Sequence, residues 1–329
     1  MSASYRYPSR RRGLEPVDLD VFAGDLLAVI GPNGAGKSTL LRLLAGEFAL
    51  SGGQVQVFGR PAHALPPSER ARLGVGVDEP AHADELAGRE NAHFFARANG
   101  LRAADATARV DALFQRLGLS GDAGVPAGAW SFGMRRKLHL VETLAHAPDL
   151  VLLDEPTIGL DAGSLAGLRA LLAAITRSGA AIVFATNDLH GLVPIATRIV
   201  FLHDGRKAAD ASPSSLLERV RGVTRFDIAL DGQAPREIRF PPGATGTVRD
   251  GGCVVETAAG TELLPGVCAA LVQAGARIRA IRVREPDLTD VFRELTGAEL
   301  DPTGPSDESG HAGHQPASHR RAREADGRE

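Results

Sequence analysis

Cysteine is nearly absent from this sequence of 329 residues, which contains two, Cys253 and Cys268. Two cysteines cannot build a disulfide-rich scaffold or a four-cysteine zinc site, so we expect a reducing compartment, the cytoplasm. Long apolar runs are also missing, because charged residues interrupt each stretch before the roughly 18 residues that a membrane span needs. Residues 1–12 have no apolar block of the secretory kind. If the protein serves a membrane, we expect another chain to cross it.

A surplus of one charge sign is missing as well. Lys and Arg number 37 and Asp and Glu 40, which gives a formal net charge of −3 at pH 7. This balance provides no general attraction to nucleic acid, so we expect no nucleic-acid partner, and any phosphate binding must be local. The content of 43% hydrophobic and 23% charged residues is typical of a soluble folded protein. At about 150 residues per domain, the length predicts two domains and an additional tail.

Strand-length apolar runs alternate with helical patterns over the first part of the chain. The runs cover residues 26–30, 54–58, 73–77, 150–153 and 181–185. This alternation predicts an α/β domain over residues 1–220, with a mainly parallel sheet between helices. Residues 84–147 lack strand patterns, and Val110, Leu113 and Phe114 have the spacing of an amphipathic helix. We therefore expect a helical subdomain inserted between two strands.

The character of the sequence changes after residue 220. Strand patterns occur at residues 223–230, 236–240, 253–257 and 277–283. Helical patterns occur at residues 261–274 and 287–295. Together they predict a small α+β domain over residues 221–298. Residues 299–329 are rich in Pro, Gly, Ser, His and charge with almost no aliphatic side chain. Such a segment cannot offset its own ordering entropy, so we expect a disordered tail.

A phosphate-binding loop follows the first apolar run. The segment fits the pattern G-x-x-x-x-G-K-[ST] at every position and precedes leucines at helical spacing. Its glycines let backbone N–H groups turn towards a triphosphate, the helix N-terminus adds partial positive charge and Lys37 adds a full one. Ser38 is expected to ligate Mg²⁺. The candidate binding residues are Gly31, Pro32, Asn33, Gly34, Ala35, Gly36, Lys37, Ser38 and Thr39.

A pair of acids ends the run 150–153. Four aliphatic residues followed by Asp154 and Glu155 are typical of a buried strand whose C-terminal end carries a site. Asp154 would hold Mg²⁺ through water, and Glu155 would orient and deprotonate an attacking water. An acidic pair also occurs in ordinary loops, but its combination with the phosphate loop indicates a site for a nucleoside triphosphate.

These features, with a third segment between them, resemble the ATP-binding subunits of ABC transporters. The segment Ala-Trp-Ser-Phe-Gly-Met is similar to the family's signature sequence, because Ser131 and Gly133 match it. The leucine, first glycine and glutamine that are usual there are replaced by Trp130, Phe132 and Met134. Residues 156–161 are similar to the segment that ends in the family's D-loop aspartate, here Asp161. The resemblance covers about residues 4–205 and implies the P-loop NTPase fold of the family.

The resemblance implies a head-to-tail dimer, homodimeric or heterodimeric, that encloses two ATP molecules. Ser131, Gly133 and the helix after them would face the phosphate loop of the other subunit, where a helix N-terminus stabilises a triphosphate. Asp161 is implied to contribute to the same nucleotide site. Tyr7 matches the family's adenine-stacking aromatic residue, and the alternative is an ordinary exposed tyrosine near the chain end.

Two positions depart from the family in ways that bear on hydrolysis. Where a glutamine is usual after the run 73–77, this chain has Asp78, which can still ligate Mg²⁺ but adds negative charge near the γ-phosphate. Where a switch histidine is usual, it has Asn187, an amide donor that never becomes positive. Loss of one charge-assisted hydrogen bond costs about 1.5 to 3 kcal/mol, or roughly 10- to 100-fold in rate. The two substitutions favour slow hydrolysis.

Residues 284–297 carry a narrower resemblance. They are similar to the closing motif of ATPase subunits of the daunorubicin-resistance exporter type, which pair with a separate ABC-2 type membrane subunit. Within this segment an apolar helical face is expected to pack at a domain seam. That face is formed by Leu288, Val291, Phe292 and Leu295.

The leading hypothesis is therefore an ATPase, peripheral on the inner face of the cell membrane, that uses ATP and Mg²⁺ to energise a permease. Export of drugs, lipids or other hydrophobic compounds is the expected task. The alternative is a nucleotide-gated binding or regulatory module with little hydrolysis, motivated by Asp78 and Asn187. A chromosome- or repair-type ABC ATPase is disfavoured, because residues 37–131 leave no room for a long coiled-coil insertion. The short arginine runs at 10–12 and 320–321 are interpreted as exposed charge rather than lipid contacts.

Overall fold

One six-stranded sheet organises the larger unit of the molecule. The computed structural model describes residues 2–7, 13–77, 82–220, 222–231, 238–249, 251–284 and 286–300. The sheet has the order β10-β9-β3-β8-β7-β6, parallel except for β10, which is antiparallel to β9. Its strands are β3 (Leu26–Ile30), β6 (Leu73–Gly76), β7 (Leu150–Asp154), β8 (Ala181–Thr186), β9 (Arg198–His203) and β10 (Arg206–Ala211). The α/β fold class predicted from the sequence is confirmed.

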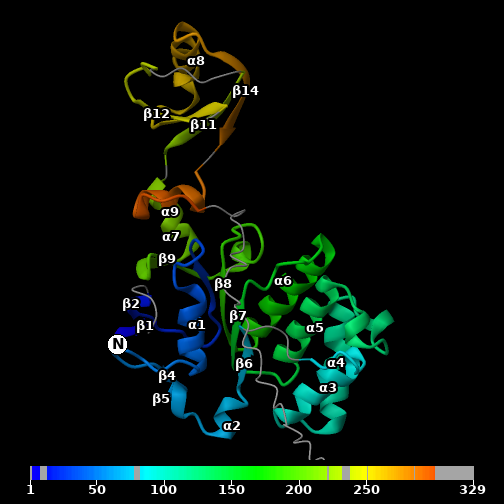
Figure 1. Cartoon of the computed structure of the whole chain (residues 1–329). Helices are drawn as coiled ribbons and strands as arrows, with labels where there is room; N and C mark the ends of the chain where they lie inside the picture. The colour runs from blue at the N-terminus through cyan, green and yellow to red at the C-terminus, as the bar shows by residue number, and fades with distance from the viewer. Residues whose placement is uncertain are drawn as a thin grey trace, which may run out of the picture.

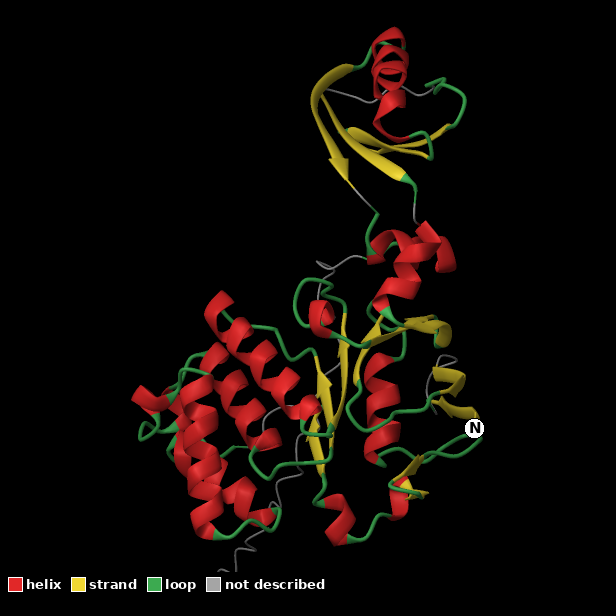
Figure 2. Ribbon diagram, turned by 180° about the vertical axis from the view of Figure 1, so that it is seen from behind, coloured by secondary structure: helices red, strands yellow, loops and turns green. Residues whose placement is uncertain are grey.

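Helices cover both faces of this sheet (Figures 1 and 2). In β3, Leu27 and Val29 pack in the cluster that contains the leucines of α1 (Lys37–Ala45), whereas Leu26, Ala28 and Ile30 pack in the cluster that contains α6 (Ala162–Arg177). A strand buried on both faces needs apolar residues at every position, which explains the continuous apolar runs in β3 and β8. The run 54–58 forms only the two-residue strand β4 (Gln56–Val57), paired with β5 (Arg60–Pro61). A further antiparallel pair joins β1 (Ser2–Arg6) and β2 (Gly13–Asp18).

The chain between β6 and β7 is helical in its described part, as expected from its lack of strand patterns. Its helices include α3 (Gly88–Ala98), α4 (Ala103–Arg116) and α5 (Phe132–Leu144). Trp130, just before α5, is almost fully buried, and its ring packs directly on Gly88. A Cβ atom at residue 88 would lie 2.1 Å from that ring, so glycine is required there. The tryptophan that departs from the family's leucine thus fills space that a glycine leaves open.

The C-terminal unit has its own sheet and core. The sheet is antiparallel with the order β12-β13-β11-β14, and α8 (Leu264–Gln273) packs on one face. Its strands are β11 (Thr224–Asp231), β12 (Ala244–Arg249), β13 (Gly252–Thr257) and β14 (Arg277–Arg284). The predicted strand at 236–240 is wrong where it can be checked, because residues 238–240 are irregular and the strand lies at 244–249 instead. Pro241 and Pro242 interrupt pairing before it, since proline donates no backbone hydrogen bond.

Helix α9 (Leu288–Thr296) packs on the larger unit rather than on the small sheet. Phe292 is fully buried there, with its ring 5.4 Å from that of Phe201 in β9. Leu216 of α7 (Pro213–Leu217) belongs to the same apolar cluster. From the sequence we assigned residues 288–296 to the C-terminal domain, but this helix packs in the core of the larger unit. We call α9, with its contacts to α7 and β9, the seat of the small sheet. Figures 1 and 2 show the small sheet projecting beyond α7 and α9.

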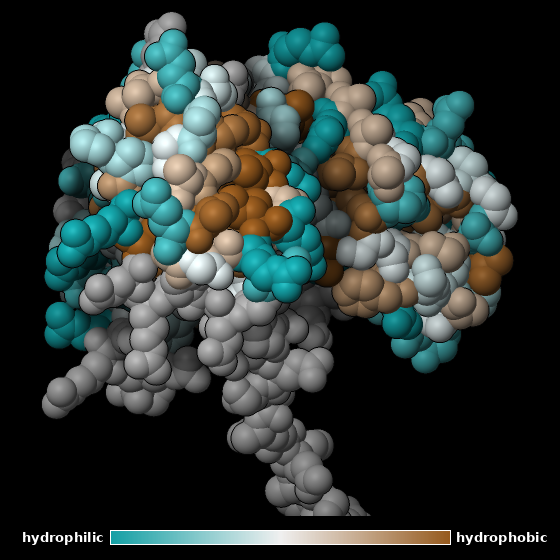
Figure 3. All heavy atoms as spheres, turned by 90° about the horizontal axis from the view of Figure 1, so that it is seen from above, coloured by the Kyte–Doolittle hydropathy of each residue, from teal (hydrophilic) through white to brown (hydrophobic). Residues whose placement is uncertain are grey.

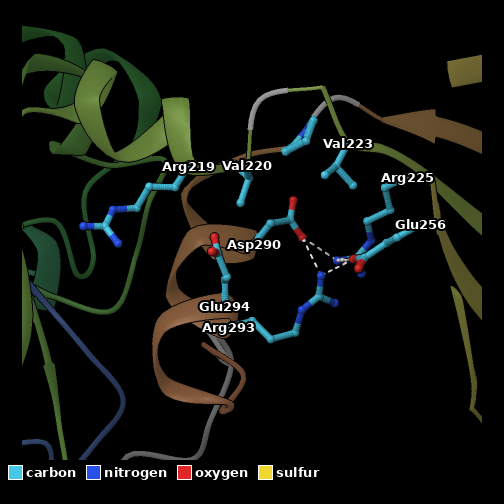
Figure 4. A pocket seen from close by; sticks show the side chains of 9 residues that line it. Arg219, Val220, Val223, Arg225, Glu256, Asp290, Arg293 and Glu294 are labelled. Carbon is cyan, nitrogen blue, oxygen red and sulfur yellow. Dashed lines mark hydrogen bonds and ion pairs between the residues drawn. The ribbon is translucent and has the colours of Figure 1, made fainter. Parts of the chain in front are cut away.

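One buried carboxylate joins the two units at this seat (Figure 4). Asp290 of α9 is only 6% exposed and accepts hydrogen bonds from Arg225 of β11 at 2.5 Å, Arg284 of β14 at 3.1 Å and Arg293 of α9 at 3.2 Å. Arg293 also pairs with Glu256 of β13. A pocket of about 310 Å³ lies beside this network. Both strands that lead into and out of the small sheet are therefore bonded to a single residue of α9.

Strand β14 is one of the two edge strands of the small sheet and carries four arginines and no acid. Ile281 and Val283 on the same strand are exposed hydrophobic residues, as are Val248 and Val272 elsewhere in this unit. Figure 3 looks down on this end of the molecule and shows apolar side chains bordered by hydrophilic ones. None of the helices in the described ranges combines the length and apolarity needed to span a bilayer.

Candidate functional site

The phosphate loop lies between β3 and α1, as predicted. Gly34 and Gly36 have φ values of 80° and 102°, which only glycine adopts easily, so the loop turns without strain. A Cβ atom at Gly31 would lie 2.2 Å from the carbonyl oxygen of Leu202, so this position also requires glycine. Lys37 is only 6% exposed, and its Nζ atom donates to the Gly31 carbonyl oxygen at 2.8 Å. The lysine is thus held beside the loop before any nucleotide binds.

Lys37, Asp154 and Glu155 meet at the C-terminal end of β7. Lys37 Nζ lies 3.6 Å from Glu155 Oε1, and Asp154 accepts a hydrogen bond from the Ser38 hydroxyl. Burial raises the pKa of Asp154, and the Ser38 hydrogen bond and Lys37 oppose that rise. Burial likewise raises the pKa of Glu155, against the opposing charge of Lys37, and lowers the pKa of Lys37. Burial at this site therefore favours the protonated forms of Asp154 and Glu155.

The end of β8 holds the Glu155 side chain. Thr186 donates its hydroxyl to Glu155 Oε2 at 2.9 Å, and the backbone N–H of Asn187 also hydrogen-bonds the carboxylate. Thr186 in turn accepts from the Asp188 backbone N–H at 3.0 Å. Parallel strands β7 and β8 are neighbours, so their C-terminal ends bring Glu155 and Asn187 together. Sequence reasoning missed Thr186, whose position beside Asn187 was the available signal.

The signature segment forms a second cluster with residues 156–161. Ser131 caps α5 by accepting from the Met134 backbone N–H at 3.3 Å, and Phe132 is 60% exposed. Gly133 is packed against Gly159, because a Cβ atom at Gly133 would lie 2.5 Å from the Gly159 carbonyl oxygen.

Asp161 closes this second cluster as the cap of α6. It accepts from the Ser164 backbone N–H at 2.9 Å and pairs with Lys137 of α5 at 3.4 Å. The backbone and hydroxyl hydrogen bonds from Ser164 lower the pKa of Asp161 well below its usual range. The aspartate therefore stays ionised and links α5 to α6.

Arg136 joins the two clusters and was not predicted from the sequence. Its Nη2 atom donates to the carbonyl oxygens of Asp154 at 2.8 Å and Glu155 at 3.1 Å. It lies on α5, five residues after Ser131. An arginine between Arg135 and Lys137 has no distinguishing sequence signal, because such a run is typical of a solvated helix face.

Tyr7 lies beside the phosphate loop, with its hydroxyl 2.9 Å from the Thr39 hydroxyl. Its ring meets that of Tyr5 edge to face at 4.9 Å. Asp78, which replaces the family's usual glutamine, lies outside the described residues. The roles of Tyr7 in adenine stacking and of Asp78 in Mg²⁺ binding remain predictions.

The donor set at the loop suits Mg²⁺. The Ser38 hydroxyl and the Asp154 carboxylate are hard oxygen donors that are hydrogen-bonded to each other, and the carboxylate is largely removed from solvent. Among the described residues no group of three His, Cys, Asp or Glu side chains could hold a metal ion. Mg²⁺ needs no such cage, because it is commonly held by one or two protein oxygens with waters and substrate phosphates.

Comparisons with known proteins agree with this geometry. A profile of the family described as "ABC transporter" matches residues 14–158. The chain is 33% identical over 300 residues to the daunorubicin resistance ATP-binding protein DrrA3 of Streptomyces coeruleorubidus, covering 90% of this chain and 94% of that protein. It is 31% identical over 299 residues to the fluoroquinolones export ATP-binding protein MT2762 of Mycobacterium tuberculosis (strain CDC 1551 / Oshkosh), covering 90% and 92%.

A solved structure extends the agreement to three dimensions. The "Structure of ATP binding subunit of ABC transporter" superposes with a TM-score of 0.61 at 27% identity, covering 66% of this chain and 90% of that one. The daunorubicin and fluoroquinolone relatives match along more than nine tenths of their own length, so the similarity is not confined to residues 14–158. The chain therefore belongs to the ATP-binding subunits of ABC transporters, a family of ATPases, and resembles those of the daunorubicin-resistance type.

Proposed function

We propose that two copies of this chain, or one copy and a related subunit, close head to tail on two ATP molecules. The observation that carries the proposal is the division of site residues into two clusters. Lys37, Asp154 and Glu155 form one, and Ser131 with Gly133 forms the other, at the exposed N-terminus of α5. A helix N-terminus with an exposed serine cap is suited to bind a γ-phosphate presented by a partner. Each cluster then completes the site of the other copy.

In the closed dimer the chain's own groups divide the work of hydrolysis. The loop amides, Lys37 and the partner's signature helix hold the triphosphate, and Tyr7 contacts the adenine. Glu155 accepts a proton from the attacking water, because its carboxylate is oriented by the hydroxyl of Thr186 at 2.9 Å. Ser38 and Asp154, together with Asp78, hold Mg²⁺, which when bound neutralises charge on the phosphate oxygens. Asn187 contacts the γ-phosphate from the end of β8.

The work is delivered to an ABC-2 type permease at the inner face of the cell membrane, for export of a drug, lipid or other hydrophobic compound. The names of the daunorubicin and fluoroquinolone relatives support this assignment of substrate class. Exposed apolar residues on the helical segment after β6 support docking of an apolar partner there, since Leu86 is 42%, Phe94 64% and Val125 39% exposed. No cargo contact is expected on this chain.

The test is the variant Glu155→Gln in the full-length protein. We expect turnover to fall to background, while ATP with Mg²⁺ traps a dimer that elutes at twice the monomer mass. Asp188→Asn, an acid at the nearby end of β8 whose carboxylate bonds only the backbone N–H of His190 among its described contacts, is the matched control. Retention of full activity in Glu155→Gln would remove the role of Glu155, and failure to trap a dimer at saturating ATP would remove the two-cluster arrangement.

A nucleotide-gated module with little hydrolysis is the second candidate, favoured by Asn187 at the end of β8 and by Asp78 in the sequence. The double variant Asn187→His with Asp78→Gln restores the family's usual pair. If the wild-type rate of phosphate release with the permease is at background and the double variant does not raise it, the gated module is the better description. A measurable wild-type rate that rises roughly 10- to 100-fold in the variant supports a slow transport ATPase.

A further inference from the structure

Glu155 has an unusual backbone, and its conformation needs an explanation. Its φ of 43° lies in the left-handed region, which a residue with a side chain adopts only with strain. Its backbone N–H donates to the Ala185 carbonyl oxygen at 2.9 Å, which fixes one side of the turn to β8. The other side of the turn is its carbonyl group, which Arg136 contacts. The turn is thus held from two different elements.

We propose that Arg136 is a positioning residue, which fixes the backbone turn at Glu155 and thereby couples the signature helix to the general base of its own subunit. This rests on the proposed function of Glu155. A single guanidinium nitrogen bridges the carbonyl oxygens of Asp154 and Glu155 at 2.8 and 3.1 Å. Such a bridge is possible only while both carbonyls point to α5, which is the case in the left-handed turn. The arginine therefore favours the strained conformation over a relaxed one.

The coupling follows from where the arginine is anchored. Arg136 and Ser131 lie on the same helix, about one and a half turns apart. Helices shift as units at subunit interfaces, so a partner's nucleotide that draws Ser131 forward also displaces the Arg136 guanidinium. The carbonyls of Asp154 and Glu155 then shift, and with them the carboxylate that faces the subunit's own nucleotide. Occupancy of one site is thus transmitted to the base of the other.

Without Arg136 the Glu155 carbonyl oxygen keeps one long contact, from the backbone N–H of Ile158 at 3.4 Å. The Glu155 carboxylate has Thr186 and Lys37 as partners, and both remain when Arg136 is replaced. Loss of Arg136 is therefore expected to affect the orientation of the base more than the binding of ATP, whose contacts are in the phosphate loop. Arg135, the preceding residue, is likewise partly exposed, and within the described ranges its side chain makes no hydrogen bond or ion pair. It serves as a matched control.

The experiment compares Arg136→Gln, Arg136→Lys and Arg135→Gln in the full-length protein. We expect Arg136→Gln to lower kcat about ten-fold with KM for ATP changed less than about two-fold, because charge-assisted hydrogen bonds to the turn are lost. Lysine keeps a charged donor for one carbonyl and should recover part of kcat, and Arg135→Gln should match the wild type. Amide hydrogen exchange in the nucleotide-free protein should accelerate over residues 155–160 in Arg136→Gln alone.

Distinct results separate this inference from the proposed function. Wild-type kcat in Arg136→Gln, or equal loss in Arg135→Gln, would overturn the positioning role while leaving the ATPase assignment intact. A rise in KM with unchanged kcat would also overturn it, since that pattern belongs to uniform binding. A wild-type protein without turnover would overturn the proposed function, and the exchange measurement would then still decide whether Arg136 holds the turn.

Discussion

The ionisable side chains at the end of β7 show at the scale of single residues why the site is poised for a triphosphate. Lys37, Asp154 and Glu155 are all desolvated, so burial disfavours the charged form of each. Lys37, Arg136 and Arg42 oppose the effect of burial on Asp154, and a bound Mg²⁺ would favour the ionised form of this acid further. Substitutions here change binding and chemistry in separable ways.

Lys37→Met is expected to weaken ATP binding about 10- to 100-fold, because it removes the one full positive charge of the phosphate loop and leaves Glu155 unpaired. Titration calorimetry of the purified protein with ATP measures the change. Lys207→Met, on β10 away from the loop, is the control and should bind ATP normally. Equal affinity of Lys37→Met and wild type would exclude Lys37 from phosphate binding.

Thr186→Val is expected to move the acid limb of the pH–rate profile to higher pH. The hydroxyl of Thr186 lowers the pKa of Glu155 against the larger effect of burial, so its removal lets that pKa rise further. The base must be ionised to act, so activity is then lost at a higher pH as the solution is acidified. Thr176→Val on α6 is the matched control. A limb that stays in place or moves to lower pH contradicts the assigned hydrogen bond.

At the scale of elements, the apolar face of α9 packs on the large unit and so fixes the position of the C-terminal unit. Phe292 and Val291 are fully buried against the large unit, and Phe292 meets Phe201 edge to face. The helix is also capped by Asp287, which accepts from the backbone N–H of Thr289 at 2.8 Å. A short helix of this kind derives its stability mainly from packing.

Phe292→Ala should therefore lower the free energy of unfolding by about 3 to 5 kcal/mol, through lost burial and the cavity that remains. Denaturation in urea followed by circular dichroism measures the loss. Phe22→Ala removes a ring that is 63% exposed and is expected to change stability little. If both variants lose the same stability, α9 is not the seat of the C-terminal unit.

The elements that sequence reasoning located are those with a strong local signal. The run before the phosphate loop became β3, and the aliphatic run before the two acids became β7, since strands buried on both faces need such runs. The strand β12 was placed too early, because Val248 is the only large apolar residue among residues 244–249 and the strand is defined by pairing with β13. Thr186 and Arg136 entered the site only through three-dimensional contacts, which spacing along the chain does not encode.

At the scale of the whole molecule, the two units are held together through Asp290. Arginines from β11, β14 and α9 all bond this one carboxylate, which is almost completely buried. Removing a single partner from a buried ion cluster leaves uncompensated charge and is strongly destabilising. The orientation of the small sheet therefore depends on one side chain.

Asp290→Ala should release the small sheet from its seat, with a loss of about 3 kcal/mol in its stability. Limited trypsin digestion measures the release, because cleavage near residue 222 should become faster than in the wild type. Asp227→Ala, which removes a more exposed acid that also pairs with Arg225 and Arg284, is the control. Identical digestion of Asp290→Ala and wild type would show that the apolar face of α9 alone fixes the seat.

The arginine-rich outer strand β14 has a consequence for how the protein behaves at high concentration. Its backbone edge is open, and open edges invite joining of one sheet to the next. Two copies aligned edge to edge would bring together six guanidinium groups, those of Arg277, Arg279 and Arg282 from each strand, because Arg284 is paired with acids. Like-charge repulsion then opposes growth into continuous sheets, and added salt weakens that repulsion. The protein should therefore stay soluble at low ionic strength, and its turbidity should increase as salt is added.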